Sequence, residues 1–248
     1  MLIACDMKTV GKAFVLAGGI GTRLRPFTYE IPKPLLPVKG RPILEYNIRN
    51  LMEHGVKEVV LGIGYKGDLI KEYFGDGSNL GIKIRYSKET KPLGTAGALK
   101  KAERHFKDTF FMCNGDEIKD VNYSKMLQLH RKKQALGTLA LKRLSNIEQF
   151  GVVELRGNKI MRFVEKPKPG TTKSKTVSAG AYVLEPNILK LIPKGKRFSI
   201  ERQVFPKLAE QEKLYGCLAV GQWFPTDTFE RYEKAIKNTR FYKRWFRA

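Results

Sequence analysis

The chain has 248 residues, 42% of them hydrophobic, which is enough for one large domain or two small ones and argues against disorder. No apolar run approaches the roughly 20 residues that span a bilayer, and the apolar start of the chain is too short for a signal peptide. The net charge of +23 would suit a nucleic acid, an anionic membrane or a phosphate-rich substrate, and it does not choose among them.

The first 120 residues alternate between short apolar runs and amphipathic segments. The runs predict strands over residues 12–18, 57–64, 82–87 and 108–116, and the amphipathic segments predict helices over 41–55, 67–75 and 94–106. This alternation is typical of an α/β fold with a mostly parallel sheet. Because crossovers between parallel strands are right-handed, we expect the loops after the strands to share one edge of the sheet, where such folds bind ligands.

After residue 120 the pattern changes. We predict helices over 122–134, 198–211 and 228–248, and short strands over 137–144, 150–157, 158–167 and 177–186. The second half of the sheet is therefore expected to be mixed. One face of the last helix is apolar and predicts packing on its own domain, with a subunit interface or an anionic membrane surface as alternatives. That face consists of Tyr232, Ala235, Ile236, Thr239, Tyr242 and Phe246.

A glycine-rich loop, "LAGGIGTRLRPFTYEIPKPLLPV", follows the first strand at residues 16–38. It does not match a phosphate-binding G-x-x-x-x-G-K-[ST] loop, and Leu24 stands where a dinucleotide fingerprint needs its third glycine. Glycines free the backbone to turn its N–H groups inward as an anion nest, and nearby cations would suit a polyphosphate. Prolines would hold one of those cations close to the nest. The residues concerned are Gly18, Gly19, Gly21, Arg23, Arg25 and Lys33, with Pro26, Pro32, Pro34 and Pro37. Taken alone, the loop is equally well explained as a tight turn with surface arginines.

The chain resembles the sugar-1-phosphate nucleotidyltransferases, also called nucleoside-diphosphate-sugar pyrophosphorylases, over residues 10–238. The resemblance rests on the glycine loop and on "PLGTAGAL", "NGD", "FGVVE", "FVEKP", "SAGAYVL" and "DTFERYEKA". It implies a single Rossmann-like domain with a mostly parallel mixed sheet, of the GT-A-like type. It also implies a nucleotide-binding half over 10–120, a sugar-phosphate-binding half over 121–227 and a basic helix over 228–248. Since no hexapeptide repeat is present, we expect no C-terminal β-helix.

The resemblance also implies roles for individual residues. Nucleotide binding is expected at Leu16, Gly18, Gly19, Gly21, Thr22, Arg23, Gly94 and Thr95. The catalytic cations on the phosphates would be Arg23 and Lys33. Sugar and phosphate would contact Gly151, Glu165, Lys166, Ser178 and Gly180. Magnesium would bind Asp116 and Asp227.

The implied chemistry agrees with the residue types. A sugar 1-phosphate would attack the α-phosphorus of a nucleoside triphosphate and release pyrophosphate. The second pKa of a phosphate monoester is about 6, so the nucleophile is already mostly dianionic at neutral pH and needs no general base. Positioning and charge neutralisation remain, and two carboxylates on Mg²⁺ together with Arg23, Lys33 and Lys166 would supply them.

Two positions depart from the family pattern. Ser178 stands where many members carry an Asn that contacts the sugar, which weakens any inference about sugar identity. In "WFPTDT", a strict alignment puts Pro225 at the place of the metal-binding Asp. We assign Asp227 because cytidylyltransferases look similar around "MDT". A helix cap is the alternative role for Asp227.

Glu89 bears on the base. Pyrimidine-using members often carry a Gln in this region, whereas an ionised carboxylate only accepts hydrogen bonds. Guanine offers adjacent N1–H and N2–H₂ donors to one carboxylate. We therefore expect Glu89 to bind the base of GTP, with a surface role as the alternative.

The expected substrates are GTP with mannose or heptose 1-phosphate, with dTTP, UTP or CTP and glucose 1-phosphate as the alternative. Of another class, a non-catalytic regulatory or translation-factor-like relative stays open. No nucleic acid partner or membrane span is expected, and a homo-oligomer stays open. Three widely spaced cysteines, Cys5, Cys113 and Cys217, predict neither a disulfide framework nor a zinc site, which favours the cytoplasm.

Overall fold

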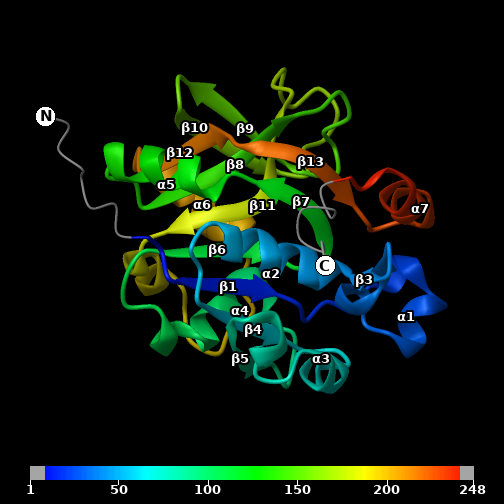
Figure 1. Cartoon of the computed structure of the whole chain (residues 1–248). Coiled ribbons are helices and arrows are strands. Elements are labelled where there is room, and N and C mark those ends of the chain that lie inside the picture. Colours follow the sequence, from blue (N-terminus) through cyan, green and yellow to red (C-terminus); the bar gives the residue numbers. More distant parts are fainter. Residues whose placement is uncertain (1–8, 241–248) are drawn as a thin grey trace, which may run out of the picture.

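A computed structural model, which describes residues 9–240, shows an α/β fold built on one mixed sheet (Figure 1). Within these residues the sheet has nine strands in the order β5-β4-β1-β6-β11-β8-β12-β10-β9. The strands are β1 (Lys12–Leu16), β4 (Glu58–Ile63), β5 (Lys83–Lys88), β6 (Phe110–Asn114), β8 (Gly137–Arg143), β9 (Gly151–Arg156), β10 (Lys159–Glu165), β11 (Thr176–Leu184) and β12 (Leu214–Leu218). The predicted fold class is confirmed.

The remaining elements surround this sheet. The α-helices are α1 (Phe27–Glu30), α2 (Ile43–Glu53), α3 (Gly67–Phe74), α4 (Gly94–Lys101), α5 (Tyr123–Lys132), α6 (Phe205–Glu210) and α7 (Phe229–Asn238). Two short antiparallel pairs are formed by β2 (Pro37–Val38) with β3 (Arg41–Pro42) and by β7 (Glu117–Val121) with β13 (Val220–Pro225). Short 3-10 helices span Thr22–Leu24, Lys33–Leu35, Ser78–Leu80, Glu103–His105 and Pro186–Leu191, and a π-helix spans Ile200–Val204. None of the described helices is long and apolar enough to cross a bilayer.

The N-terminal half of the sheet is parallel, as its apolar strands predict. β1 pairs in parallel with β4 and β6, and β4 pairs in parallel with β5. Ala13, Phe14 and Val15 are all fully buried, because helices cover both faces of this strand. From β11 onward the pairing is mixed, since β11 runs antiparallel to β6 and β8, while β12 is parallel to β8.

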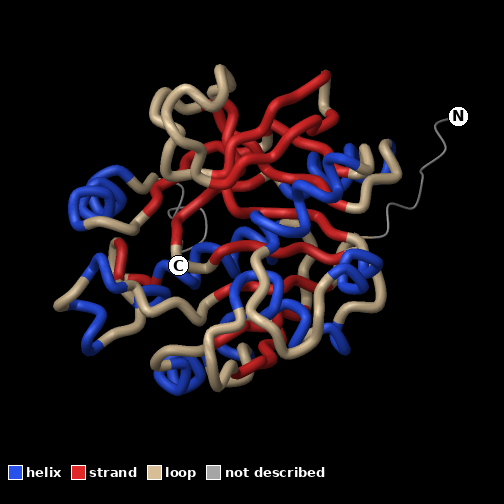
Figure 2. The backbone as a smooth tube through the Cα atoms, turned by 180° about the vertical axis from the view of Figure 1, so that it is seen from behind, coloured by secondary structure: helices blue, strands red, loops and turns tan. Residues whose placement is uncertain are grey.

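Helices pack on both faces of the sheet, seen from behind in Figure 2. On one face, side chains of α2, α3 and α5, such as Ile48, Ile70 and Met126, share a core with the strands. On the other face, α4, α6 and the turns before α6 bury Leu99, Phe205 and others. This three-layer arrangement leaves the carboxyl ends of β1, β4 and β6 at one open edge.

The last helix packs on its own domain. Tyr232, Ala235 and Thr239 are buried, and the Tyr232 hydroxyl donates to the Pro37 carbonyl at 2.6 Å. Phe229 meets Phe27 of α1 edge-to-face at 5.4 Å, so α7 lies beside α1 (Figure 1). The prediction is confirmed for the described part of the helix. Tyr242 and Phe246 lie outside the described residues.

Candidate functional site

The glycine loop and the segment before α4 line a first cavity of about 610 Å³ at the open edge of the sheet. The predicted nucleotide-binding residues that line it are Leu16, Gly18, Gly19, Gly21, Glu89, Gly94 and Thr95. Thr22 lies in the exposed turn Thr22–Leu24 and lines neither this cavity nor the one described next.

A second cavity of about 190 Å³ adjoins the first. It is lined by every residue predicted to bind the sugar phosphate, which are Gly151, Glu165, Lys166, Ser178 and Gly180, and also by Arg23 and Asp227. Lys33, Asn114 and Asp116 line both cavities. A ligand in one cavity would therefore meet a ligand in the other at these three side chains.

Close packing fixes the glycine loop. A Cβ on Gly18 would lie 3.1 Å from the Gly64 nitrogen, so two loops at the ends of β1 and β4 approach each other without side chains between them. Gly21 has a φ of 69°, in the left-handed region that favours glycine. The Thr28 hydroxyl donates to the Gly21 carbonyl at 2.9 Å, and the Tyr65 hydroxyl donates to the Thr28 carbonyl at 2.9 Å.

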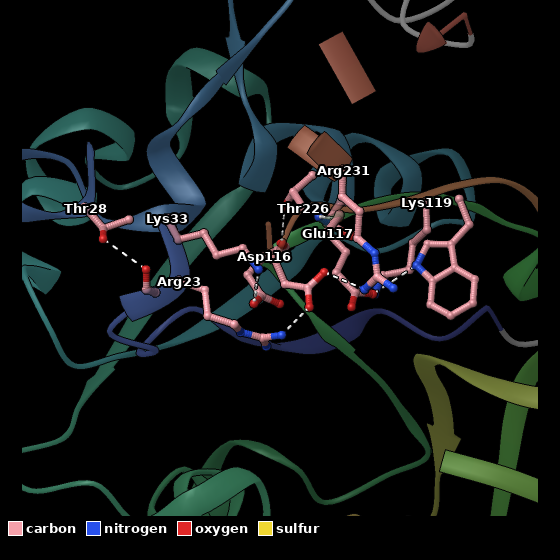
Figure 3. A network of polar contacts seen from close by, with 12 residues as sticks. Arg23, Thr28, Lys33, Asp116, Glu117, Lys119, Thr226 and Arg231 are labelled. Carbon is pink, nitrogen blue, oxygen red and sulfur yellow. Dashed lines mark hydrogen bonds and ion pairs between the residues drawn. The ribbon is translucent and has the colours of Figure 1, made fainter. Parts of the chain in front are cut away.

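Lys33 forms an ion pair with Asp116 where the two cavities meet. The Lys33 ammonium, in a side chain only 6% exposed, lies 2.8 Å from Asp116 Oδ2 (Figure 3). Desolvation acts to raise the pKa of the Asp116 carboxyl, but the charge and hydrogen bond of Lys33 and the charge of Lys119 lower it below its usual value. Asp116 is therefore ionised at neutral pH.

Asp227 is held between two arginines. Its Oδ2 lies 2.5 Å from Arg23 Nη1, and its Oδ1 lies 2.8 Å from Arg231 Nη1. Burial acts to raise the pKa of Asp227, but the hydrogen bond and charge of Arg231 and the charge of Arg23 lower it. The helix-cap alternative is wrong, because the hydroxyl that accepts from the Arg231 backbone N–H at the start of α7 belongs to Thr228.

Pairing between β7 and β13 brings the two acidic segments together. Pro225 lies opposite Glu117 in this pair, so the residues just before β7 and just after β13 become neighbours. The Thr226 hydroxyl then donates to the Asp116 carbonyl at 2.7 Å (Figure 3). Two carboxylates line this cavity beside the cationic side chains of Arg23 and Lys33, and carboxylates of this kind are ligands that Mg²⁺ uses together with phosphate oxygens.

The sequence profile of the family described as "Nucleotidyl transferase" matches residues 12–240. The chain belongs to the nucleotidyl transferase family. This confirms the resemblance that the motifs indicated.

The relatives of this chain are named for several different substrates. It is 37% identical to a mannose-1-phosphate guanylyltransferase of Mycobacterium tuberculosis and 35% identical to a UTP–glucose-1-phosphate uridylyltransferase of Synechocystis. These matches cover 89% and 91% of the chain but only 62% of each relative, so the chain spans about three fifths of their length. It is also 34% identical to a D-glycero-alpha-D-manno-heptose 1-phosphate guanylyltransferase of Aneurinibacillus thermoaerophilus, over 93% of the chain and 99% of the relative.

Solved structures show the same fold. A putative glucose-1-phosphate thymidylyltransferase from Bacillus anthracis superposes with a TM-score of 0.81 at 24% identity, over 91% of this chain and 94% of that one. HddC from Yersinia pseudotuberculosis, complexed with GMP-PN, superposes with a TM-score of 0.75 at 26% identity, over 92% and 99%.

Glu89 lines the first cavity, and one oxygen of its carboxylate is already engaged. Its Oε2 accepts from the Leu93 backbone N–H at 2.8 Å. Burial raises the pKa of Glu89, although the Leu93 N–H and the charge of Lys101 act in the opposite direction. The other oxygen remains available for donors in the cavity.

The sugar-phosphate side lies at the ends of β10 and β11. Lys166 follows β10 with a φ of 52°, and Gly180 lies at an irregularity of β11 with a φ of 64°. Burial raises the pKa of Glu165, and the neighbouring charge of Glu201 adds to this effect. Glu201 also accepts from the Thr95 hydroxyl at 2.6 Å, which connects the two cavities at a second place.

Several lining residues of the second cavity were not predicted from the sequence. They are Asn114, Glu117, Gln149, Phe150, Phe163, Tyr182, Glu201, Trp223, Pro225 and Arg231. Asn114 is the first residue of the recognised "NGD" motif and Glu117 follows it directly, so both were within reach of the sequence reasoning. Glu201, in the π-helix, and Trp223, in a strand that we did not predict, gave no comparable signal.

Proposed function

We propose that this chain transfers a nucleotidyl group from a nucleoside triphosphate to a sugar 1-phosphate and releases pyrophosphate. The observation that carries the proposal is the junction of the two cavities at Lys33, Asn114 and Asp116. One cavity opens onto a glycine loop suited to a triphosphate, and the other onto hydroxyl-binding side chains and Lys166. The α-phosphorus and the attacking phosphate would meet where they join.

The side chains at the junction provide charge neutralisation. Lys33 and Arg23 are already close to the carboxylates of the site, and Lys166 lines the sugar side. In phosphoryl and nucleotidyl transfer, positioning and electrostatic stabilisation account for most of the catalysis. Since the dianionic nucleophile needs no base, the lack of a histidine among the described residues that line the two cavities agrees with this chemistry.

We assign Mg²⁺ binding to Asp116 and Asp227, because both line the second cavity and both have lowered pKa values that keep them ionised. Bound Mg²⁺ would neutralise the charge that the phosphates carry during transfer. Residues Arg23 and Lys33, which pair with these carboxylates here, would then contact substrate phosphates instead.

Our preferred substrates are GTP with mannose or heptose 1-phosphate. Glu89 in the first cavity supports guanine, since a carboxylate can accept from both N1–H and N2–H₂. Guanylyltransferases among the relatives support the same choice. The uridylyltransferase relative keeps UTP with glucose 1-phosphate as the second candidate. We place the reaction in the cytoplasm, with support from two free, buried cysteines, Cys113 and Cys217.

The test is pyrophosphate release with Mg²⁺ across GTP, UTP, dTTP, CTP and ATP, each against mannose, glucose and heptose 1-phosphates. Release that needs both substrates supports the proposal and identifies base and sugar together. Folded protein that is silent across the whole matrix contradicts the transferase function and favours the regulatory alternative.

Glu89→Gln tests the base assignment. We expect the preference for GTP over UTP to fall by about tenfold or more, on the scale of one hydrogen bond to a charged group. Glu233→Gln is the matched control, because Glu233 lies exposed on α7, lines neither cavity and pairs with Lys237 among the described residues. A wild-type preference for a pyrimidine nucleotide that Glu89→Gln leaves unchanged would exclude this role.

A further inference from the structure

Glu117 is an acidic side chain in the sugar-phosphate cavity that the chemistry proposed above does not use. It is the first residue of β7, directly after Asp116, and its side chain is 18% exposed. It lines the second cavity with Glu165, Ser178 and Gly180, whereas it does not line the first. Its position fits contact with the sugar rather than with the nucleotide.

Two donors, a fully buried ammonium and a half-buried indole N–H, hold one oxygen of this carboxylate. Trp223 Nε1 donates to Glu117 Oε2 at 3.0 Å, and Lys119 Nζ donates to the same oxygen at 3.3 Å. The first of these donors comes from β13 and the second from β7, so the pairing of these strands assembles the arrangement (Figure 3). Both donors reach Oε2, and within residues 9–240 no hydrogen bond engages Oε1, which leaves that oxygen for a group in the cavity.

Lys119 is a fully buried cation with a complete set of partners. Its side chain is 0% exposed, and its ammonium also donates to the carbonyls of Ala179 and Gly180, each at 3.2 Å. An ammonium has three N–H donors, and these three contacts account for all of them. Burying a charge is costly unless it is paired and hydrogen-bonded, so Lys119 fixes both the Glu117 carboxylate and the β11 backbone at Gly180.

The other groups around this cavity are rich in acceptors. Glu165 and Glu201 line it, and the Asn114 side-chain oxygen is buried with no hydrogen-bond partner within residues 9–240. Sugar hydroxyls are donors that would match such a lining. Because Oε2 is already hydrogen-bonded, the orientation of the Glu117 carboxylate is fixed before the sugar binds. Oε1 therefore selects for a sugar with a hydroxyl at one position.

We propose that Glu117 is a specificity-determining residue, whose Oε1 accepts a hydrogen bond from one ring hydroxyl of the sugar 1-phosphate. Lys119 and Trp223 act as positioning residues through Oε2. The proposal rests on the proposed nucleotidyl transfer. Loss of the matching hydroxyl lowers kcat/KM by about 10- to 100-fold, the scale of a hydrogen bond to a charged group.

Glu117→Gln is an informative variant because it preserves shape. The Lys119 ammonium and the Trp223 indole N–H require an acceptor, so we expect the amide oxygen to take the place of Oε2 and the NH₂ group to face the cavity. The variant thereby turns a charged acceptor into a neutral donor at the point where the sugar binds.

The experiment combines this variant with monodeoxy substrates. The probes are mannose 1-phosphate, or glucose 1-phosphate if it turns over faster, and each of its monodeoxy analogues at carbons 2, 3, 4 and 6. The quantity compared is the ratio of kcat/KM for the parent sugar to kcat/KM for each deoxy analogue. In the wild type we expect this ratio to be about 10 to 100 at one position, and in Glu117→Gln we expect it to fall to about threefold or less at that position. Glu233→Gln is expected to keep the wild-type ratio, and the nucleotide KM stays unchanged in all three proteins.

A second variant covers the case in which Glu117→Gln does not fold because Lys119 loses its counter-charge. Trp223→Phe removes the indole N–H and keeps the ion pair, and it is expected to reduce the same ratio by at least threefold. If the wild type and a folded variant show equal ratios of kcat/KM between the parent sugar and its deoxy analogues, the role of Glu117 is overturned while the proposed function stands. Lack of turnover by the wild type with every substrate overturns the proposed function, and this inference with it.

Discussion

Gly180→Ala tests the packing beneath the sugar-phosphate cavity. A Cβ at this position would lie 2.6 Å from Asn114 Nδ2 and 3.3 Å from Lys119 Nζ. Neither group can retreat easily, because the Asn114 side-chain oxygen is buried and Lys119 is fully enclosed. The backbone at Gly180 also has a φ of 64°, which costs an alanine about 1 kcal/mol.

The control is Gly157→Ala. Gly157 has a φ of 61°, close to that of Gly180, but a Cβ there would meet nothing within 4 Å. It therefore isolates the backbone cost of about 1 kcal/mol, whereas the clash at Gly180 adds the about 1–3 kcal/mol typical of overpacking. For a chain of this size, the melting temperature should fall by about 2–4 °C in Gly157→Ala and by about 4–16 °C in Gly180→Ala.

Thermal unfolding measured by calorimetry or circular dichroism compares the two variants with the wild type. The KM for the sugar 1-phosphate should rise in Gly180→Ala only, since Asn114 lines the cavity and would have to move. If Gly180→Ala loses no more stability than Gly157→Ala, the close approach of Asn114 and Lys119 to Gly180 is refuted.

Three further predictions concern the site and the core. Lys33→Ala and Asp116→Asn should each lower kcat/KM by at least about 100-fold in a steady-state assay, and near-wild-type activity in either would mean that the site is misplaced. Arg23→Ala should tighten Mn²⁺ binding measured by calorimetry without nucleotide, because Arg23 competes with the metal for Asp227, and unchanged or weaker binding would contradict this. Burial lowers the pKa of His130 below its usual value in the folded chain, so the unfolded chain binds the proton more readily and stability falls as the pH drops below about 6.5. Urea unfolding at pH 7.5 and 5.5 should show a larger loss for the wild type than for His130→Gln, and equal losses would refute the assignment.

The alternation of strands and helices was readable from the sequence because local patterns produce it. Residues 41–55 carry an apolar face at helical spacing, and α2 forms there, with a glycine of positive φ at residue 55. The run that became β1 is apolar from Ala13 to Leu16, after Lys12 at its start, because helices cover both faces of the sheet at that point. Fold class and much of the element order follow from such short-range patterns.

Some elements could not be predicted, because the local sequence does not contain what determines them. Residues 117–121, "EIKDV", carry a lysine on the buried side, and hydrophobic patterning reads a lysine as exposed. The predicted helix over 198–211 is a π-helix followed by α6, with Pro206 near the start of α6, where a proline is tolerated. In both cases a tertiary partner, rather than the local sequence, determines the conformation.

The sequence by itself determined the glycine loop, the cations that follow it and the motif residues that form each half of the candidate site. Only the tertiary structure decided that Lys33, Asn114 and Asp116 join two cavities, and that β13 pairs with β7. That pairing spans about a hundred residues and brings Trp223 and Asp227 into the site. Hydrogen bonds between strands that are distant in the sequence form only when the whole sheet assembles, so a local sequence pattern cannot predict them.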